Sequence, residues 1–416
     1  MSEPDTPKQR RYLAFVENKA EPLDGVPPSR ITFVLDCVES VAFQEGRFED
    51  HEALALVRIL STPRRLLDLF ELPRLPTEGD WLEIMLSDNP GNQPLAWCLS
   101  ARNNYQGPAE RLYLVGLRFL PSEREPGLAA KDPEAATLPE RQMVALQFMV
   151  SPPIGDRDER VAFDALFADV AAKSGLHARV LDVGQACAIA LCNEKSSAAR
   201  ILGFFDVGWP LWFHSGSLPK AWTKLKLAPD GDGFVILSHW DFDHFAMALW
   251  KEPGLRKLRW YAPHQAVGPN TKAFADSLGD RLTYLSQPTY GPPNVQLFRG
   301  LGAQNGVPDD RNATGYVLRF EREGHGRLLA GDVDYRHVPP GALANLAGVY
   351  IPHHAGSGGT KPPTPAGGGG EAVASYGLPN KYRHPNDAVL NAHYSLGWNV
   401  QHTASTKKVP RGDRWL

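Results

Sequence analysis

Short apolar runs separated by turn-rich polar intervals predict a series of strands in the first part of the chain. The runs lie at residues 31–38, 81–86, 95–100 and 112–120. The sequence D-N-P-G-N at residues 88–92 is rich in turn formers and predicts the connection between the second and third runs.

Two segments instead carry apolar residues at helical spacing. Residues 50–72 do so at Ala53, Leu56, Val57 and Leu60, with an interruption near Pro63. Residues 160–173 do so at Phe163, Leu166, Phe167 and Val170, which predicts an amphipathic helix. Between them, residues 121–139 are charged and rich in proline, which predicts an exposed connection.

From residue 177 onward the pattern predicts strands alternating with helical intervals. Residues 178–185 form the first predicted strand, residues 188–192 are expected to pair with it, and residues 201–206 form a third. Residues 355–370 (A-G-S-G-G-T-K-P-P-T-P-A-G-G-G-G) are of low complexity, so we expect a flexible surface loop there.

Length and composition favour a soluble protein of two domains. The chain has 416 residues, more than one ordinary hydrophobic core accommodates, and we expect domains at residues 1–165 and 175–416. Hydrophobic residues make up 43% and charged residues 22%, as in globular proteins. The net charge of −3 neither requires nor excludes a nucleic-acid partner.

Cysteine usage and the N-terminus point to a cytoplasmic location. The four cysteines show no C-x-x-C pair, so each is expected to be a small buried hydrophobe in a reducing compartment. Residues 1–11 are polar and carry no secretory signal, and no apolar run is long enough to span a bilayer. We therefore expect no membrane association.

The chemistry concentrates in residues 234–244, F-V-I-L-S-H-W-D-F-D-H. An apolar strand ends abruptly in two histidines and two aspartates, the pattern of a strand that feeds a site at its carboxyl end. Imidazole nitrogen and carboxylate oxygen together suit zinc, manganese or iron. The alternative is a solvated acidic loop with two incidental histidines, which does not explain why the ligands directly follow an apolar strand.

Further motifs follow in a fixed order along the chain: V-L-D-V-G-Q (180–185), F-F-D-V-G (204–208), S-H-W-D-F-D-H (238–244), L-L-A-G-D (328–332), I-P-H-H-A-G-S (351–357) and N-K-Y-R-H-P (380–385). This succession resembles the metallo-β-lactamase fold and, more narrowly, the soluble hydrolase domain of competence-type (ComEC-type) DNA-uptake proteins. The resemblance covers residues 177–410 and none of the first 165. It implies an α/β fold in which an αββα sandwich is preceded by a smaller α+β domain of unknown type.

The resemblance also implies two divalent metal ions, zinc or manganese. His239 and Asp241 would serve one position and Asp243 and His244 the other, with Asp243 also placed among the catalytic residues. Two such ions about 3.5–4 Å apart activate a shared hydroxide for an in-line displacement. Aspartate at position 241, where many relatives carry histidine, makes the site harder and tilts it towards manganese.

The remaining ligands come from two later motifs. Asp332 resembles the carboxylate that bridges the two metals, and either His353 or His354 resembles the last ligand. Asp206 resembles a strand-end aspartate that supports the site without binding metal, and Asp182 and Gln185 of the first motif are expected to support it as well.

Residues near the C-terminus are candidates for contacts with the substrate. His384 resembles a histidine that faces the active site and could protonate a leaving alkoxide or bind phosphate. The alternative is a surface histidine that caps the helix start near Pro385. Asn312 could donate a hydrogen bond to a substrate oxygen, and Lys381 and Arg383 could bind the substrate.

Two departures from the family pattern bear on the substrate rather than on the metal. Gln185 is followed by Ala186 and Cys187 where the family has Gly-Asp, and Phe245 and Ala246 stand where a Gly-Gly pair is common. Both changes reshape the floor and entrance of the pocket.

The function expected from these features is metal-dependent hydrolysis of a phosphodiester in DNA or RNA. Residues 376–416 carry six Lys/Arg against two Asp with interleaved aromatic residues, which suits a nucleic acid but equally suits a solvated basic tail. The alternatives are hydrolysis of a small phosphoester or nucleotide, and an effector that a protein partner activates through residues 1–165.

Overall fold

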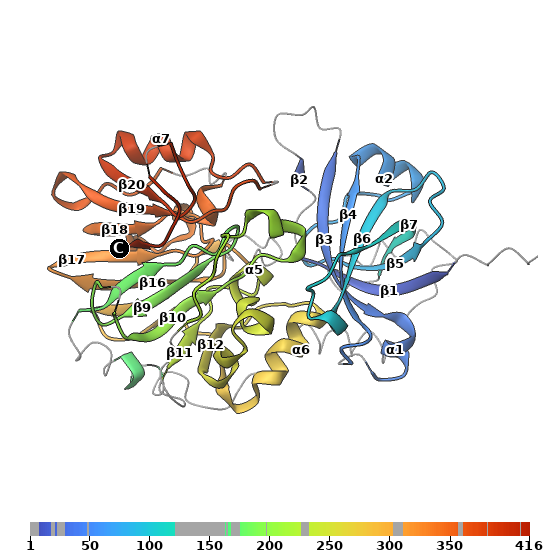
Figure 1. Ribbon diagram of the computed structural model, residues 1–416, viewed down its shortest axis with the longest axis horizontal. Helices are drawn as coiled ribbons and strands as arrows, with labels where there is room; N and C mark the ends of the chain where they lie inside the picture. Colours follow the sequence, from blue (N-terminus) through green and yellow to red (C-terminus); the bar gives the residue numbers. More distant parts are fainter. Residues whose placement is uncertain are drawn as a thin grey trace, which may run out of the picture. The chain divides into compact units, whose positions relative to one another are not determined.

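The computed structural model describes residues 8–17, 21–22, 30–47, 50–120, 163, 165–167, 175–196, 198–225, 233–302, 311–356, 361–380, 382–407 and 409–416. The chain forms two compact units (Figure 1). The first comprises Met1–Pro152 and Ala266–Ser277, and the second comprises Pro153–Gln265 and Leu278–Leu416. The segment Ala266–Ser277 therefore groups with the first unit although it lies in sequence between strands of the second.

The first unit is built on an antiparallel sheet that closes on itself. Its strands are β1 (Gln9–Val16), β2 (Glu21–Pro22), β3 (Ile31–Glu39), β4 (Leu54–Ser61), β5 (Trp81–Ser87), β6 (Leu95–Ser100) and β7 (Glu110–Phe119). The strand order is β1-β5-β7-β6-β4-β3-β2, and β1 also pairs with β3, so six strands form a closed barrel. The four strands predicted between residues 31 and 120 are confirmed.

The helix predicted over residues 50–72 is wrong in its first half. Residues 54–61 form strand β4, which pairs with β3 on one side and β6 on the other. Seven of its eight residues are buried, so the polar alternation that identifies a half-buried strand is missing. Helix α2 (Pro63–Leu69) begins only afterwards, where the Thr62 hydroxyl accepts from the Arg65 amide at 3.1 Å.

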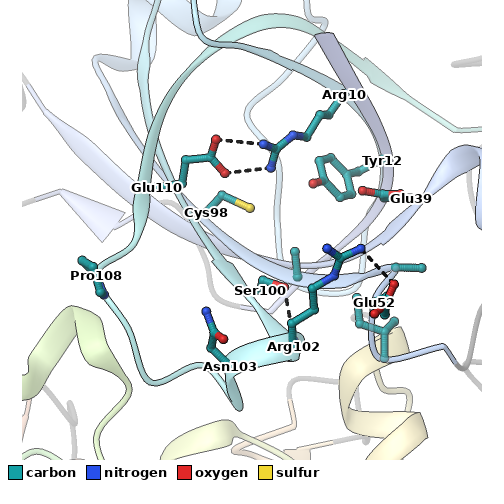
Figure 2. A pocket seen from close by; sticks show the side chains of 13 residues that line it. Arg10, Tyr12, Glu39, Glu52, Cys98, Ser100, Arg102, Asn103, Pro108 and Glu110 are labelled. Carbon is teal, nitrogen blue, oxygen red and sulfur yellow. Dashed lines mark hydrogen bonds and ion pairs between the residues drawn. The ribbon is translucent and has the colours of Figure 1, made fainter. Parts of the chain in front are cut away.

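A cavity of about 430 Å³ opens at one end of the barrel. Four of the charged side chains that line it form two pairs, Arg10 with Glu110 at 2.7 and 2.8 Å and Arg102 with Glu52 at 3.0 Å (Figure 2). The short helix α1 (Ser40–Gln44) follows β3 at this end.

The second unit contains two seven-stranded sheets. One has the order β13-β12-β11-β10-β9-β8-β21 and the other the order β14-β15-β16-β17-β18-β19-β20. The first sheet consists of β8 (His177–Val180), β9 (Ala188–Cys192), β10 (Ile201–Val207), β11 (Phe234–Ile236), β12 (Arg259–Pro263), β13 (Leu282–Leu285) and β21 (Arg414–Trp415). The second consists of β14 (Thr289–Tyr290), β15 (Val295–Arg299), β16 (Tyr316–Arg322), β17 (His325–Leu329), β18 (Leu346–Tyr350), β19 (Gly370–Ala374) and β20 (Trp398–His402).

The two sheets pack face to face and helices cover their outer faces. Leu329 and Tyr350 enter a core shared with β8–β12 of the other sheet, whereas the adjacent Leu328 and Val349 join a second core with helix α7 (Asp387–Ser395). On the other outer face, the Trp260 indole donates to a carbonyl of the 3-10 helix η5 (Pro253–Lys257) at 3.0 Å. The predicted αββα sandwich is observed.

Several predicted segments fall partly or wholly outside the described residues. Residues 121–139 lie outside them, as do residues 357–360 of the low-complexity segment. Of the helix predicted over 160–173, residues 163 and 165–167 are described and are helical. Phe163 and Phe167 stack with ring centroids 4.5 Å apart inside the core shared by the two sheets.

The sequence predicts buried cysteines without disulfide bonds and no segment that spans a membrane. All four cysteines are free and buried, as predicted. Within the described ranges, no helix combines the length and hydrophobicity needed to cross a bilayer.

Candidate metal centre

The predicted ligands come together because the strands that precede them end at the same edge of each sheet. Asp206 lies in β10, and His239 follows the parallel strand β11 closely. Helix α5 (Phe242–Phe245) then carries Asp243 and His244. In the second sheet, Asp332 and His354 follow the parallel strands β17 and β18.

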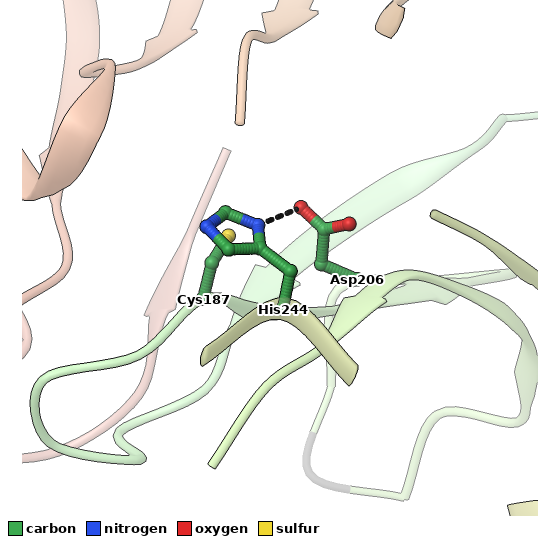
Figure 3. A group of neighbouring side chains, drawn as sticks. All are labelled: Cys187, Asp206 and His244. Carbon is green, nitrogen blue, oxygen red and sulfur yellow. Dashed lines mark hydrogen bonds and ion pairs between the residues drawn. The ribbon is translucent and has the colours of Figure 1, made fainter. Parts of the chain in front are cut away.

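Asp206 sets the orientation of His244. Its carboxylate accepts hydrogen bonds from the Ser238 amide at 2.7 Å and the Ser238 hydroxyl at 2.8 Å, and it lies 2.9 Å from Nδ1 of His244 (Figure 3). A carboxylate in this position holds the proton on Nδ1, so the lone pair of the ring is on Nε2. The support role predicted for Asp206 has a geometric basis in these contacts.

His354 is oriented in the same way by a backbone carbonyl. Its Nδ1 donates to the Ser375 carbonyl oxygen at 3.0 Å. Its Nε2 therefore faces Asp243 Oδ2 at 3.2 Å and Asp332 Oδ1 at 4.0 Å. His244 Nε2 lies 3.3 Å from the same Asp332 oxygen.

The residues fit a divalent cation. His239 Nε2, His244 Nε2 and Asp332 Oδ1 are buried and have no hydrogen-bond partner among the described residues. Donor atoms bound to one tetrahedral ion at about 2.0–2.2 Å are roughly 3.3–3.6 Å apart, close to the spacings found here. Buried polar atoms without partners are costly, and a cation would satisfy all three.

Among the residues that the structure describes, three groups have ligand atoms within 4.8 Å of one another: His239–His244–Asp332, Asp243–His244–His354 and Cys187–Asp206–His244. His244 belongs to all three. In the third group, Asp206 lies at Nδ1 of His244 and already accepts its proton (Figure 3). Burial raises the pKa of the Cys187 thiol to about 12, so this cysteine is not a ready thiolate.

The protonation of the cluster follows from its charges. Burial raises the pKa of Asp332, but His244, His353 and His354 outweigh it and hold that pKa well below the usual range. Burial lowers the pKa of His244, but Asp332 and Asp206 raise it well above the usual range. Without a metal ion, His244 therefore carries a proton that a cation must displace.

The adjacent histidines 353 and 354 differ in their surroundings. The His353 side chain is 38% exposed, with Nδ1 3.4 Å from Asp332 Oδ2 and 3.3 Å from the Asn312 amide nitrogen. The His354 side chain is 3% exposed and belongs to a candidate ligand group. The geometry favours His354 as the ligand and places Asn312 beside the site.

Asp241 has a neighbour that the sequence did not indicate. One guanidinium nitrogen of Arg311 lies 2.9 Å from Asp241 Oδ1, and His239 Nε2 lies 3.3 Å from Oδ2. Burial raises the pKa of Asp241, but Arg311 and then His239 lower it below the usual range. Arg311 precedes Asn312, which the sequence predicts as a substrate contact. No local pattern could pair this arginine with an aspartate 70 positions earlier.

His384 faces the centre and is held by Gln185. The Gln185 amide nitrogen lies 3.1 Å from His384 Nδ1, and burial followed by the charges of His353 and His354 lowers the pKa of His384 to about 3. The ring is therefore neutral at pH 7. The cap of helix α7 is Asn386, whose side chain accepts from the Ala388 amide at 2.8 Å, so His384 does not serve as that cap.

Other predicted residues lie apart from the cluster or outside the described ranges. Asp182 accepts a hydrogen bond from the Arg411 guanidinium at 2.8 Å and so anchors the C-terminal segment. Arg383 is exposed next to His384, and Lys381 lies outside the described residues. The Tyr382 ring stacks between His214, at 4.8 Å, and His384, at 5.6 Å.

No family model and no curated protein matches the sequence. Among solved structures, Zn²⁺-bound PqqB from Methylobacterium extorquens is 13% identical, and the match covers 58% of this chain and 99% of that one with a TM-score of 0.34. The diiron β-hydroxylase CmlA from Streptomyces venezuelae is 14% identical over 80% and 59%, with a TM-score of 0.27. A putative Zn-dependent hydrolase of the metallo-β-lactamase superfamily from Thermotoga maritima is 13% identical over 56% and 79%, with a TM-score of 0.21. All three TM-scores are below 0.5. The sheets and side chains of this chain therefore define the site by themselves.

Proposed function

We propose that the chain is a metal-dependent hydrolase of the metallo-β-lactamase fold that cleaves phosphodiesters, with nucleic acid as the substrate class. The observation that carries the proposal is the set of buried, partnerless donor atoms on His239, His244 and Asp332. Uncompensated polar atoms of this kind are retained where a ligand satisfies them.

His239, Asp243, His244, Asp332 and His354 would hold the cation. A divalent ion bound there would act as a Lewis acid and lower the pKa of water towards neutrality. The chain's part is to hold the donors in place, with Asp206 orienting His244 and the Ser375 carbonyl orienting His354.

His384 supports the choice of a phosphoryl substrate. Because Gln185 donates to Nδ1, the neutral ring carries its proton on Nε2. That N–H suits a hydrogen bond to a phosphoryl or leaving-group oxygen. Of the two roles considered from the sequence, this one corresponds to binding phosphate, since the lowered pKa of about 3 leaves no imidazolium at neutral pH to protonate a leaving alkoxide.

The residues next to His384 support a nucleotide over a small phosphate. Arg383 is exposed, and Tyr382 and His214 continue the row of stacked rings away from the cluster. A guanidinium beside aromatic rings suits a phosphate flanked by a base. Arg411 of the C-terminal basic stretch contributes less, because it is already paired with Asp182.

The test is a cleavage screen with Mn²⁺ over bis-p-nitrophenyl phosphate, single- and double-stranded DNA, RNA and cyclic nucleotides. Asp332→Asn and Asp243→Asn should lose metal and turnover while the protein stays folded. Asp387→Asn, an exposed aspartate at the start of α7, is the matched control and should behave as wild type.

Each outcome separates the alternatives. Cleavage of the small diester without any nucleic acid would replace the nuclease by a small-phosphoester hydrolase. Activity that appears only after a co-encoded protein is added would favour a partner-activated effector. Full activity of Asp332→Asn at saturating metal, or a β-lactamase or thioesterase activity in place of phosphodiester cleavage, would refute the proposal.

A further inference from the structure

A buried arginine lies where a second cation would be expected. Arg311 is 1% exposed, and one of its guanidinium nitrogens donates to the Trp240 carbonyl at 3.2 Å. Another lies 2.9 Å from Asp241 Oδ1, an ion pair without hydrogen-bond alignment, since that oxygen has no hydrogen-bond partner within the described part of the chain. The Gln265 side chain fixes the loop by donating to the Arg311 carbonyl at 2.8 Å. The guanidinium is therefore a permanent positive charge at a fixed place.

Asp241 is separate from the candidate ligand groups. None of the three groups found among the described residues includes it, although His239, two positions earlier, belongs to one. A cation bound to Asp241 would lie within about 5 Å of the guanidinium, because both would contact the same carboxylate. In a buried site the repulsion between the two charges is poorly screened.

The position around His244 and His354 has enough ligand atoms for one cation. Asp243 Oδ2, Asp332 Oδ1 and the Nε2 atoms of His244 and His354 form a continuous set with neighbouring distances of 3.2, 3.3 and 4.0 Å. The two groups on the Nε2 side share His244, whose Nδ1 already faces Asp206. One ring nitrogen offers one lone pair, so these two groups describe one centre.

We propose that the chain binds one resident divalent ion, at His239, Asp243, His244, Asp332 and His354, and that the guanidinium of Arg311 replaces the second ion beside Asp241. The inference rests on the proposed metal-dependent function. It departs from the two-ion site expected from the sequence, because Asp241 neutralises an arginine instead of binding a metal. Arg311 is a positioning residue here, since nothing places it against the substrate.

The ion count of the wild-type chain is the first test. Protein stripped with chelator, reloaded with Mn²⁺ and desalted should contain one ion per chain by elemental analysis. Its electron paramagnetic resonance spectrum should be that of an isolated Mn²⁺. Two ions per chain with an exchange-coupled spectrum would overturn the inference alone. No bound ion would instead refute the metal centre on which the proposed function depends.

Variants at position 311 test the part assigned to the arginine. Arg311→Gln removes the charge and should raise the content towards two ions per chain, with a coupled spectrum, whereas Arg311→Lys keeps the charge and should retain one. A folded Arg311→Gln protein that still binds one ion would show that the guanidinium does not exclude the second.

Because Arg311 is buried, the single variant can fail to fold, and thermal unfolding must be followed for each protein. The double variant Asp241→Asn/Arg311→Gln removes both charges together and keeps the site neutral. It should bind one ion with an affinity within about threefold of wild type. Loss of the ion from a folded double variant would make Asp241 a ligand and overturn the inference.

Discussion

His384 acts through its protonation state, which its neighbours determine. Burial and the charges of His353 and His354 lower its pKa to about 3, and Gln185 lies 3.1 Å from Nδ1. We expect His384→Ala to reduce kcat on a phosphodiester about a hundredfold and to leave the metal content unchanged. The measurement is steady-state cleavage of bis-p-nitrophenyl phosphate with parallel metal analysis.

His384→Gln is the conservative companion, because a glutamine amide still donates a hydrogen bond, and it should recover part of the rate. Since the wild-type ring is already neutral above about pH 5, removing it should not alter the kcat–pH profile between pH 5.5 and 8. An unchanged rate in His384→Ala would leave this histidine with a structural role only.

Residue chemistry alone could not separate His353 from His354, because both are histidines in one motif. Both have positive φ, 51° and 54°, so the backbone turns sharply and the two rings point to different surroundings. The carbonyl that orients His354 belongs to Ser375, the residue that follows the neighbouring strand β19. The choice depends on a strand that the motif does not contain.

At the scale of elements, the join between β10 and α5 has no room for a side chain. A Cβ on Gly208 would lie 1.6 Å from the Asp243 carbonyl oxygen and 2.5 Å from that of Cys187. We expect Gly208→Ala to destabilise the protein by about 3 kcal/mol or more, since the backbone must move. It should also weaken metal binding, because Asp243 would shift. Chemical denaturation and metal titration measure the two effects.

Gly216→Ala is the matched control, as no atom lies within 4 Å of a Cβ at that position. Equal stability of the Gly208 and Gly216 variants would mean that β10 and α5 pack less tightly than described.

Strand β4 shows why a periodicity of apolar residues can mislead. Ala53, Leu56, Val57 and Leu60 match a helical spacing, yet the segment is a strand buried between β3 and β6. Where both faces of a strand are buried, its apolar positions are nearly continuous. Such a run contains residues at helical spacing by chance. Strands β5 and β6 retain the alternation and were predicted correctly.

For the whole molecule, the cluster couples stability to pH. His244 has a raised pKa in the folded, metal-free protein, so its contribution is complete below the unfolded value of about 6.5 and is lost as pH rises towards the folded pKa. Asp332 has a lowered pKa, so its contribution is present above about 3.9 and is lost as pH falls towards the folded pKa. The metal-free cluster therefore stabilises the folded protein most between about pH 3.9 and about pH 6.5.

A bound cation replaces the proton on His244. The difference in melting temperature between metal-loaded and chelator-treated protein should therefore grow from pH 6 to pH 8, and metal affinity should rise over the same interval. Differential scanning calorimetry and metal titration at both pH values measure this. A stabilisation by metal that falls with rising pH would contradict the proton displacement assigned to His244.

The sequence by itself determined what adjacent residues encode. Through their resemblance to the metallo-β-lactamase fold, the strand followed by S-H-W-D-F-D-H and the order of the later motifs predicted the sandwich. They also named the residues of the three candidate ligand groups except Cys187, and did not indicate Arg311. Short-range patterns suffice for this, because ligand type and strand ends are local properties.

Only the tertiary structure decided which of these residues share a centre. It brought Arg311 to Asp241, turned His354 rather than His353 inward, and let Asp206 orient His244. These pairs are set by how strands far apart in the chain line up, and that alignment is fixed by the packing of two whole sheets.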